Sequence, residues 1–168
     1  MALVEDKEML KLENQVCFAL YSLAKEVTKL YHPLLKDLGL TYTQYIAMLA
    51  LWERDGISVK ELGARLFLDS GTLTPLLKKL EGMGLLERRR DPRDERIVVI
   101  ELTPQGQSLK AKAECIPERL FCSAGVSAEE ADALRVQVVE TMRKLKGMPP
   151  GSDRPEEEER GGTNDGNL

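Results

Sequence analysis

Residues 68–103, LDSGTLTPLLKKLEGMGLLERRRDPRDERIVVIELT, decide the fold of this chain. Helix-capping residues open the segment, and leucines recur at helical spacing until Gly82 and Gly84, which are expected to end the helix. An arginine-dense stretch and a β-branched run follow. A helix and then a β-hairpin with a basic tip is the order of a winged helix-turn-helix, a fold that contacts DNA. The fold class is therefore mainly α with a small β-hairpin wing.

The polar residues of the predicted helix suit a recognition helix in a DNA major groove. Asp69 and Ser70 are its candidate N-caps. Off the leucine face lie short hydroxyl residues near the start and lysines near the end, Ser70, Thr72, Thr74, Lys78 and Lys79. Short residues at the start of such a helix reach base edges, while its flanks meet phosphates. Pro75 is expected near the first turn, where a missing N–H costs little.

The hairpin is rich in arginine. Strands are predicted at residues 85–86 and 97–100, with a loop at 87–96 between them. Five arginines crowd the hairpin, Arg88, Arg89, Arg90, Arg93 and Arg96. An arginine at a loop tip can enter the minor groove, where negative potential is focused. Acidic residues nearly balance these arginines, so a merely solvated surface is the alternative, although carboxylates can also orient arginines in an Asp–Arg fork.

Two further helices precede the recognition helix. Thr41 or Thr43 caps a helix that reaches about Arg54, and Ser58 caps a short helix, VKELGARL. The wing module therefore spans about residues 41–103.

Long helices flank this module. An amphipathic helix is predicted at 8–36. After the module, Thr103-Pro104 begins helices expected over about 104–146, with a loop from Cys122 to Gly125 and a Ser127 capping box before the last one. These dimerisation helices carry more apolar surface than a small wing module can bury, so they predict a two-fold homodimer. Two recognition helices about one DNA turn apart would then read a palindromic operator in double-stranded DNA.

The composition excludes several classes of protein. The 168 residues contain no long apolar run and no secretory signal, which predicts a cytoplasmic protein without a membrane segment. Three cysteines without a CxxC pair exclude a disulfide framework and a zinc ribbon, and a single histidine argues against a metal site. Neither a cofactor nor an enzymatic activity is expected.

The net charge of −4 is concentrated at the C-terminus. From Pro150 the sequence has six acidic and two basic residues, which account for −4, so residues 1–149 are near neutral. Residues 149–168 are predicted to form a disordered acidic tail with no assigned role, after a folded domain at 1–148. A local basic patch can bind DNA without a basic whole.

A second group of residues lies on the first predicted helix. Cys17 and Tyr21 are one turn apart, and Tyr31 returns close to the same face about 21 Å further along the axis. Tyr31 therefore cannot reach Cys17 of its own straight helix, whereas an antiparallel partner helix could bring it there. Because Cys17 is expected past the first turn, phenolic hydroxyls are better candidates than the helix dipole for stabilising a thiolate. The alternative is that Cys17 is only a small buried hydrophobe.

Four segments resemble the MarR family of winged-helix repressors, and more narrowly its organic hydroperoxide resistance regulators. They are LENQVCFALY, LTYTQYIAMLALWE, LDSGTLTPLLKKLEGMGLLERRR and DERIVVIELTPQG, within roughly residues 10–120. The resemblance implies that Cys17 is the peroxide-reactive cysteine and that Tyr21 and Tyr31 hydrogen-bond it, at least one of them from the other subunit. It also implies that Arg96, with Asp94 beside it, enters the minor groove. The residues expected at the DNA are Asp69, Ser70, Thr72, Thr74, Lys78, Arg88, Arg90, Asp94 and Arg96.

The resemblance also implies a mechanism. A reduced dimer represses genes for peroxide detoxification and releases the DNA when an organic hydroperoxide oxidises Cys17 to sulfenic acid. In one type of regulator a small external thiol then reacts, and in the other a second cysteine of the partner subunit forms a disulfide. The spacing from Cys17 to Cys122 resembles the two-cysteine type. Cys122 lies in the predicted loop and Cys115 in a predicted helix, which favours Cys122 but leaves Cys115 open.

Three other functions remain open from the sequence. A related repressor could respond instead to a small phenolic ligand bound between its domains, with Cys17 dispensable. A thiol peroxidase would consume peroxide steadily, although the sequence shows no thioredoxin-like pattern of strands and helices. A non-regulatory architectural protein would show little preference for a palindrome.

Overall fold

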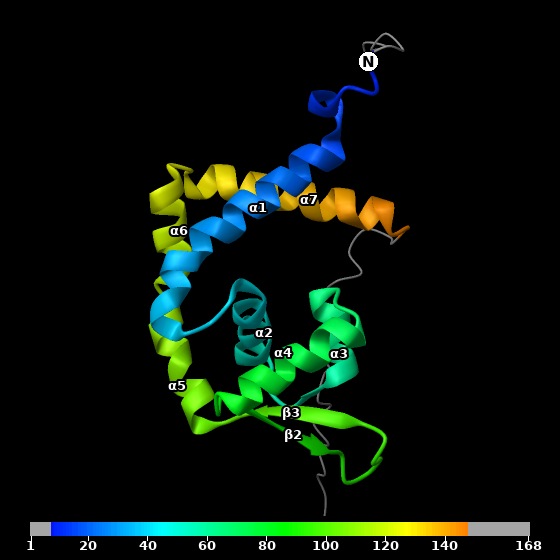
Figure 1. The fold of residues 1–168 in the computed structure, drawn as a ribbon, viewed down its shortest axis with the longest axis vertical. Coiled ribbons are helices and arrows are strands. Elements are labelled where there is room, and N and C mark those ends of the chain that lie inside the picture. The colour runs from blue at the N-terminus through cyan, green and yellow to red at the C-terminus, as the bar shows by residue number, and fades with distance from the viewer. Residues whose placement is uncertain (1–7, 148–168) are drawn as a thin grey trace, which may run out of the picture. The chain divides into compact units, whose positions relative to one another are not determined.

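The computed structural model describes residues 8–147, which form two compact units that divide between Gly125 and Val126. The second unit contains helix α7 (Ala128–Leu145), which begins at the predicted Ser127 capping box. The first unit contains the other elements (Figure 1): η1 (Leu12–Asn14), α1 (Val16–Leu35), η2 (Lys36–Leu38), α2 (Tyr42–Glu53), β1 (Ile57–Ser58), α3 (Val59–Leu66), α4 (Ser70–Gly82), β2 (Leu86–Arg90), β3 (Val98–Leu102), α5 (Pro104–Ala113) and α6 (Ile116–Ala124). The predicted acidic tail at 149–168 lies outside the described residues.

The wing is part of a three-stranded antiparallel sheet with the order β1-β3-β2. In the central strand, Ile100 pairs with Ile57 of β1 and with Arg88 of β2. The predicted hairpin is confirmed, but its strands are longer than expected, and β1 was not expected at all. Because strand pairing continues through the arginines at 88–90, these residues lie on β2 rather than in the predicted loop. The tip is thereby shortened to residues 91–97.

Side-chain caps start the helices of the wing module. Thr41 begins α2 with a reciprocal capping box, Ser58 caps α3, and Asp69 rather than Ser70 caps α4. Each cap accepts a hydrogen bond from one of the N–H groups that have no partner inside the first turn. Pro75 is the sixth residue of α4, so the prediction that placed it near the first turn is wrong. At this position the missing N–H removes a helical hydrogen bond.

The helices of the module share one core with the sheet. Helix α2 contacts α3 and α4, while α3 packs on β3 and α4 packs on β2. Helix α5 is fixed to the same core, because Trp52 Nε1 donates to the carbonyl of Gly106 (2.8 Å). Gly106 also lies so close to the base of β2 that an added Cβ would be 1.9 Å from the carbonyl oxygen of Leu85. The core is built from large apolar side chains, among them Tyr45, Met48, Leu51, Ile57, Leu62, Leu73, Leu77, Leu80, Leu86 and Ile100.

Helix α1 begins later than the helix predicted at 8–36. Gln15 is extended (φ −89°, ψ 110°), and its side chain donates to the carbonyls of Met9 and Lys11, so a separate turn precedes the helix. Cys17 is consequently the second residue of α1 and lies within its first turn, not past it as predicted. The N–H groups of that turn and the positive end of the helix dipole are therefore close to Cys17.

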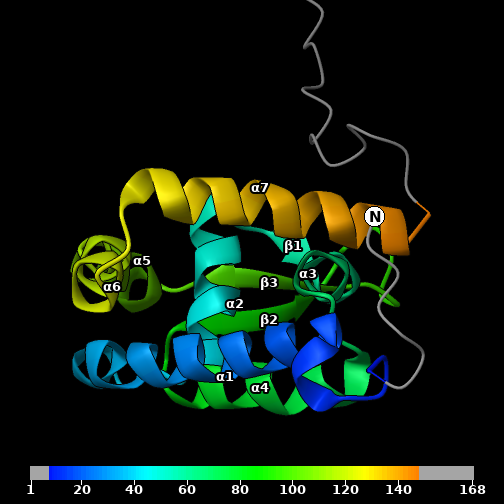
Figure 2. The same ribbon diagram turned by 90° about the horizontal axis from the view of Figure 1, so that it is seen from above.

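Helices α5 and α6 follow one another in nearly the same direction, with a break at residues 114–115 (Figures 1 and 2). Pro117 is the second residue of α6 and does not kink a continuous helix. Cys122 also lies in α6, and not in the predicted loop, because Gly125 (φ 63°) supplies only the left-handed C-cap. Cys115 lies in the break as the N-cap of α6. The local argument that favoured Cys122 over Cys115 is therefore wrong.

The N-terminal half of α1 projects away from the wing module (Figure 1). Along α1, several large apolar side chains are exposed by 38% or more, namely Val16, Phe18, Leu20, Leu23 and Leu30. Within α1, only Leu35 is buried. Helix α7 has no buried residue. Across residues 8–147, none of the helices combines the length and apolar character needed to cross a lipid bilayer.

Candidate functional site

Helix α4 buries its leucines and exposes its polar residues, as the sequence predicted. Ser70, Thr72, Thr74 and Lys78 are all exposed. Asp69 Oδ1 accepts the N–H of Thr72 (3.0 Å), and Asp69 Oδ2 accepts the Thr72 hydroxyl (3.0 Å). These hydrogen bonds, the backbone one first, lower the pKa of Asp69. Asp69 and Thr72 thus order the first turn of the helix, on the side where short residues would meet base edges.

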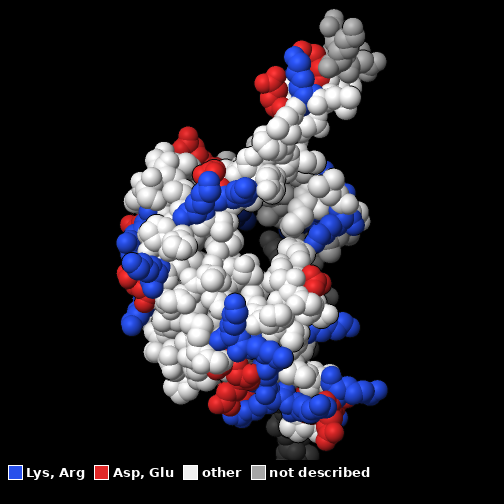
Figure 3. Space-filling model, in the orientation of Figure 1, with Lys and Arg blue, Asp and Glu red and all other residues white. Residues whose placement is uncertain are grey.

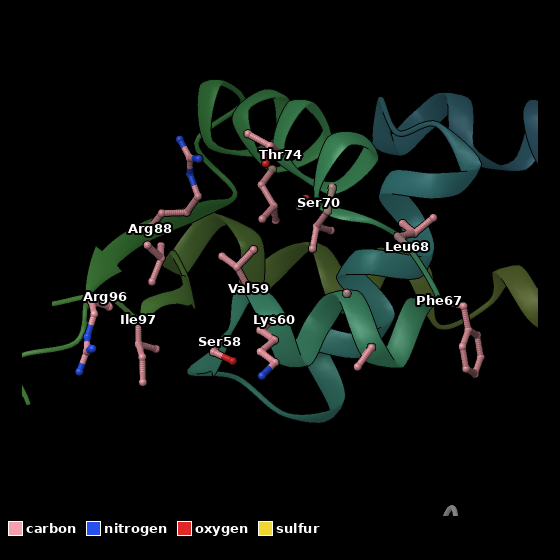
Figure 4. A pocket seen from close by; sticks show the side chains of 15 residues that line it. Ser58, Val59, Lys60, Phe67, Leu68, Ser70, Thr74, Arg88, Arg96 and Ile97 are labelled. Carbon is pink, nitrogen blue, oxygen red and sulfur yellow. The ribbon is translucent and has the colours of Figure 1, made fainter. Parts of the chain in front are cut away.

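A groove of about 760 Å³ opens beside α4, between α3 and the wing (Figure 4). Ser70 and Thr74 line it from α4, and Arg88 and Arg96 line it from the wing. Lys60 of α3 lies at the same groove and was not among the residues predicted at the DNA. Lys60 follows the Ser58 cap by two residues and so lies in the first turn of α3. That position in the sequence is the signal that could have identified it. Apolar side chains complete the lining, including Val59, Leu73, Leu77 and Val98.

The wing tip holds the predicted Asp–Arg fork. Arg96 Nε donates to Asp94 Oδ1 (3.0 Å), and the N–H of Arg96 donates to the same oxygen (3.0 Å). The side-chain hydrogen bond and then the backbone one lower the pKa of Asp94. The Arg96 side chain is nevertheless 91% exposed. The fork therefore orients a cation that remains open to a ligand.

Other arginines of the wing are paired with acidic residues. Arg88 forks onto Glu81 of α4, and Arg89 pairs with Glu87 and Glu101. The side-chain hydrogen bond from Arg88 is the main reason that the pKa of Glu81 is lowered. The space-filling view shows basic side chains crowded over the strands and the tip, with acidic ones between them (Figure 3). Arg90 Nη1 donates to the Glu95 carbonyl (3.0 Å), which closes the tip on itself.

Cys17 and Tyr21 lie on successive turns at the start of α1. Both are exposed, so the interpretation of Cys17 as a buried hydrophobe is wrong for the single chain. Lys25 Nζ lies 5.3 Å from the centre of the Tyr21 ring. Within one chain this end of α1 thus offers a thiol, a phenol and a cation on one exposed stretch of helix.

Tyr31 lies at the other end of α1 in a cluster of aromatic rings. Its ring centre is 4.8 Å from that of Tyr42 and 5.7 Å from that of Tyr45. Burial, followed by the two neighbouring phenols, raises the pKa of Tyr31 to about 12. Because α1 is continuous from Val16 to Leu35, Tyr31 is about 21 Å along the axis from Cys17 of the same chain. Tyr42 and Tyr45 were not predicted as part of the site, since nothing local in the sequence places α2 beside the end of α1.

The other two cysteines are exposed thiols on α6 and its N-cap. Cys115 Sγ lies 3.8 Å from the Lys112 carbonyl oxygen, and Cys122 lies in the last turn of the helix. All three cysteines, Cys17 included, are free. The single chain therefore brings neither candidate second thiol into a bond with Cys17.

The chain matches the family model of the SarA/Rot transcriptional regulators over residues 29–113. It is also 49% identical over 126 residues to the organic hydroperoxide resistance transcriptional regulator of Bacillus subtilis (strain 168), covering 75% of this chain and 86% of that protein. The chain belongs to the organic hydroperoxide resistance regulators of the MarR family. The resemblance noted in the sequence is thereby confirmed.

Solved structures extend the relationship of this MarR-family regulator to the whole fold. Reduced AbfR bound to DNA has a TM-score of 0.71 and 35% identity, covering 86% of this chain and 98% of that one. Disulfide-formed AbfR has a TM-score of 0.56 and 35% identity, covering 84% and 94%. The winged helix-turn-helix is confirmed, and the protein is a transcriptional regulator rather than an enzyme. The thiol peroxidase interpretation consequently loses its support.

Proposed function

We propose that this regulator is a cytoplasmic repressor that binds palindromic operator DNA as a reduced homodimer and releases it when an organic hydroperoxide oxidises Cys17. The observation that carries the proposal is the position of Cys17. It is an exposed thiol in the first turn of α1, on a stretch of helix whose apolar neighbours are also exposed. The name of the Bacillus subtilis relative supports the same class of inducer.

The DNA-binding half of the proposal uses α4 and the wing tip. Helix α4 presents Ser70, Thr74 and Lys78 outward, and the tip presents Arg96. Helix residues of this kind suit the major groove, and an exposed arginine on a loop suits the minor groove. The structural likeness to reduced AbfR bound to DNA supports this assignment.

The homodimer follows from the apolar face of α1. We infer that α1 of a second copy packs antiparallel on this face, together with the helices after residue 103, and covers the exposed leucines. That arrangement would bring Tyr31 of one chain toward Cys17 of the other, which its own α1 cannot do over about 21 Å. Tyr42 lies beside Tyr31 and would reach the same thiol. The sensing site would then combine Cys17 and Tyr21 of one chain with two phenols of its partner.

The chemistry is a two-step oxidation. The Cys17 thiolate attacks the outer oxygen of the hydroperoxide, the O–O bond breaks, and an alcohol leaves with a proton, so that a sulfenic acid remains. A second thiol then attacks the Cys17 sulfur and forms a disulfide, and water leaves. Cys122 of the partner matches the two-cysteine type, whereas Cys115 and an external thiol are the alternatives. The likeness to disulfide-formed AbfR supports a disulfide step of this kind.

Operator binding under oxidation tests the proposal. A duplex is first selected from a random pool by the reduced wild-type protein, and its binding is measured before and after one equivalent of cumene hydroperoxide. We expect loss of binding together with a dimer-sized band on a non-reducing gel, both reversed by dithiothreitol. Cys17→Ser should keep binding in both conditions, and Cys122→Ser and Cys115→Ser assign the second thiol. Release from the Cys17→Ser protein would refute the mechanism, and unchanged wild-type binding with intact thiols would favour a repressor controlled by a small ligand.

A further inference from the structure

A partly buried ion pair between Arg88 and Glu81 joins the wing to the recognition helix. Glu81 lies in the last turn of α4, and Arg88 is the third residue of β2. Arg88 Nε and Nη2 both donate to Glu81 Oε2, at 3.1 and 2.5 Å. Only 25% of the Arg88 side chain and 35% of the Glu81 side chain are exposed. Such a fork is more directional than a surface pair between flexible side chains.

The same carboxylate also holds the strand backbone. Glu81 Oε1 accepts the N–H of Arg88 at 3.1 Å. Strand β2 is at the edge of the sheet, so its outward N–H groups have no neighbouring strand to donate to. Glu81 therefore fixes β2 to α4 through the main chain as well as the side chain. The connection between them is otherwise a tight turn that contains Gly84 with a positive φ of 71°.

This attachment determines where the wing tip lies relative to α4. Arg88 is opposite Ile100, whereas the tip begins beyond the last pair, Arg90 with Val98. A small change of angle at the base is thus enlarged at Arg96, whose side chain bonds to Asp94 within the tip itself. Binding groups must be held close to their productive geometry to contribute fully.

We infer that Glu81 and Arg88 are positioning residues, which lock the wing to the recognition helix so that α4 and the tip meet DNA as one body. This inference rests on the proposed operator binding and assigns Arg88 a role different from the direct DNA contact expected from the sequence. Arg88 lines the groove together with Arg96 (Figure 4), so a direct phosphate contact is the competing role.

The variant Glu81→Gln separates the two roles because they predict opposite signs. If the pair positions the wing, Glu81→Gln weakens binding of the selected duplex by about tenfold, the usual effect of losing a hydrogen bond to a charged group. Arg88→Gln should have the same effect, and the double variant should bind no more weakly than either one. If Arg88 binds phosphate, Glu81→Gln instead tightens binding, because it frees a cation and removes a negative charge.

The salt dependence of binding supplies a matched control at the tip. Loss of one phosphate contact lowers the slope of log affinity against log salt by about 1. We expect a comparable change for Arg96→Gln, whose side chain is 91% exposed at the tip and is expected at the DNA, and an unchanged slope for Arg88→Gln. A slope lowered by about 1 in Arg88→Gln, or tighter binding by Glu81→Gln, would overturn the inference.

Hydrogen exchange tests the attachment without DNA. The amides of residues 86–90 should exchange faster in Glu81→Gln, while those of α2 are unchanged. Glu81→Asp keeps the charge but shortens the side chain, and it should show the same effect. It serves as a second variant in case Glu81→Gln destabilises the whole fold. If wild-type protein selects no duplex, the proposed function fails. If exchange at β2 is unaltered in both variants, the positioning role fails even though operator binding stands.

Discussion

The wing module and the N-terminal half of α1 contain similar apolar residues in opposite surroundings. In the module, Leu62, Leu77 and Ile100 are fully buried, and each helix begins with a side-chain cap. In α1, Val16 is 71% exposed, and Gln15 makes no capping hydrogen bond through its side chain. The module is therefore stabilised by contacts within the chain, whereas the first half of α1 leaves its apolar side chains exposed. The comparison shows that the module buries its apolar residues within one chain, while α1 leaves comparable residues exposed, as the proposed homodimer requires.

The largest effect should come from the tightest contact of the module. Gly106→Ala would place a Cβ 1.9 Å from the Leu85 carbonyl oxygen, so α5 must move off the base of the wing and its bond to Trp52 must stretch. We expect a loss of about 3 kcal/mol in the free energy of unfolding, which urea titration measures. Gly82→Ala is the matched control, since nothing lies within 4 Å of its added Cβ, and it should be neutral or slightly stabilising. Equal stability of the two variants would contradict the packing at Gly106.

A charged substitution on the apolar face of α1 should weaken the proposed dimer without unfolding the wing module. Leu23→Glu places a carboxylate on the exposed apolar face, and burying it unpaired in a dimer costs at least about 2 kcal/mol. We expect the dimer dissociation constant to rise by roughly tenfold or more, measured by sedimentation equilibrium, with little change in the thermal unfolding of the module. Glu26→Gln, on an exposed ion pair with Lys29, should leave association unaltered. A Leu23→Glu protein that dimerises as tightly as wild type would place the interface elsewhere.

The caps of the module should contribute a smaller amount each. Ser58→Ala removes the side-chain acceptor for the Glu61 N–H (3.1 Å) at the start of α3. The expected loss is about 1 kcal/mol, which guanidinium unfolding resolves. Ser58→Asp restores an acceptor and should recover most of that loss. If the alanine variant is as stable as wild type, capping is not what distinguishes the module from α1.

An effect that is absent at neutral pH should appear under alkaline conditions, at the aromatic cluster where α1 meets the module. Burial disfavours the ionised form of Tyr31 and raises its pKa from 10.0 to about 12. The folded chain therefore holds this proton at a pH where the unfolded chain has lost it, so stability falls as pH rises from about 10 toward 12. Tyr31→Phe should show a shallower fall in urea unfolding between pH 9 and about 11. Some dependence should remain in that variant, because burial also raises the pKa of Tyr45.

Much of the fold could be predicted because its signals are local. The leucine spacing of α4, the capping residues Ser58 and Thr103, and the turn at Gly82 and Gly84 act over a few residues, and all of them stand in the structure. The errors arose where one local sequence signal is compatible with two different structures. Gly125 predicted a loop around Cys122 but only ends α6, and the arginines at 88–90 suggested a loop but continue β2.

The candidate site was less accessible to sequence reasoning. The exposed polar face of α4 and the Asp94–Arg96 fork follow from neighbouring residues. Tyr42 beside Tyr31 depends on how α2 turns back onto α1, and the placement of Cys17 in the first turn depends on where Gln15 interrupts the helix.

The sequence by itself determined the order of the main helices and the hairpin, most of their caps and the charge of the wing, and it marked Cys17 as the candidate sensing cysteine. These depend on residue type and spacing along the chain, which a linear pattern records. Only the tertiary structure decided that Arg88 is paired with Glu81, that Tyr31 lies among other phenols and that the leucines of α1 stay exposed. Those outcomes depend on which elements meet in space, because burial and hydrogen bonding are set by contacts between segments rather than by the segments alone.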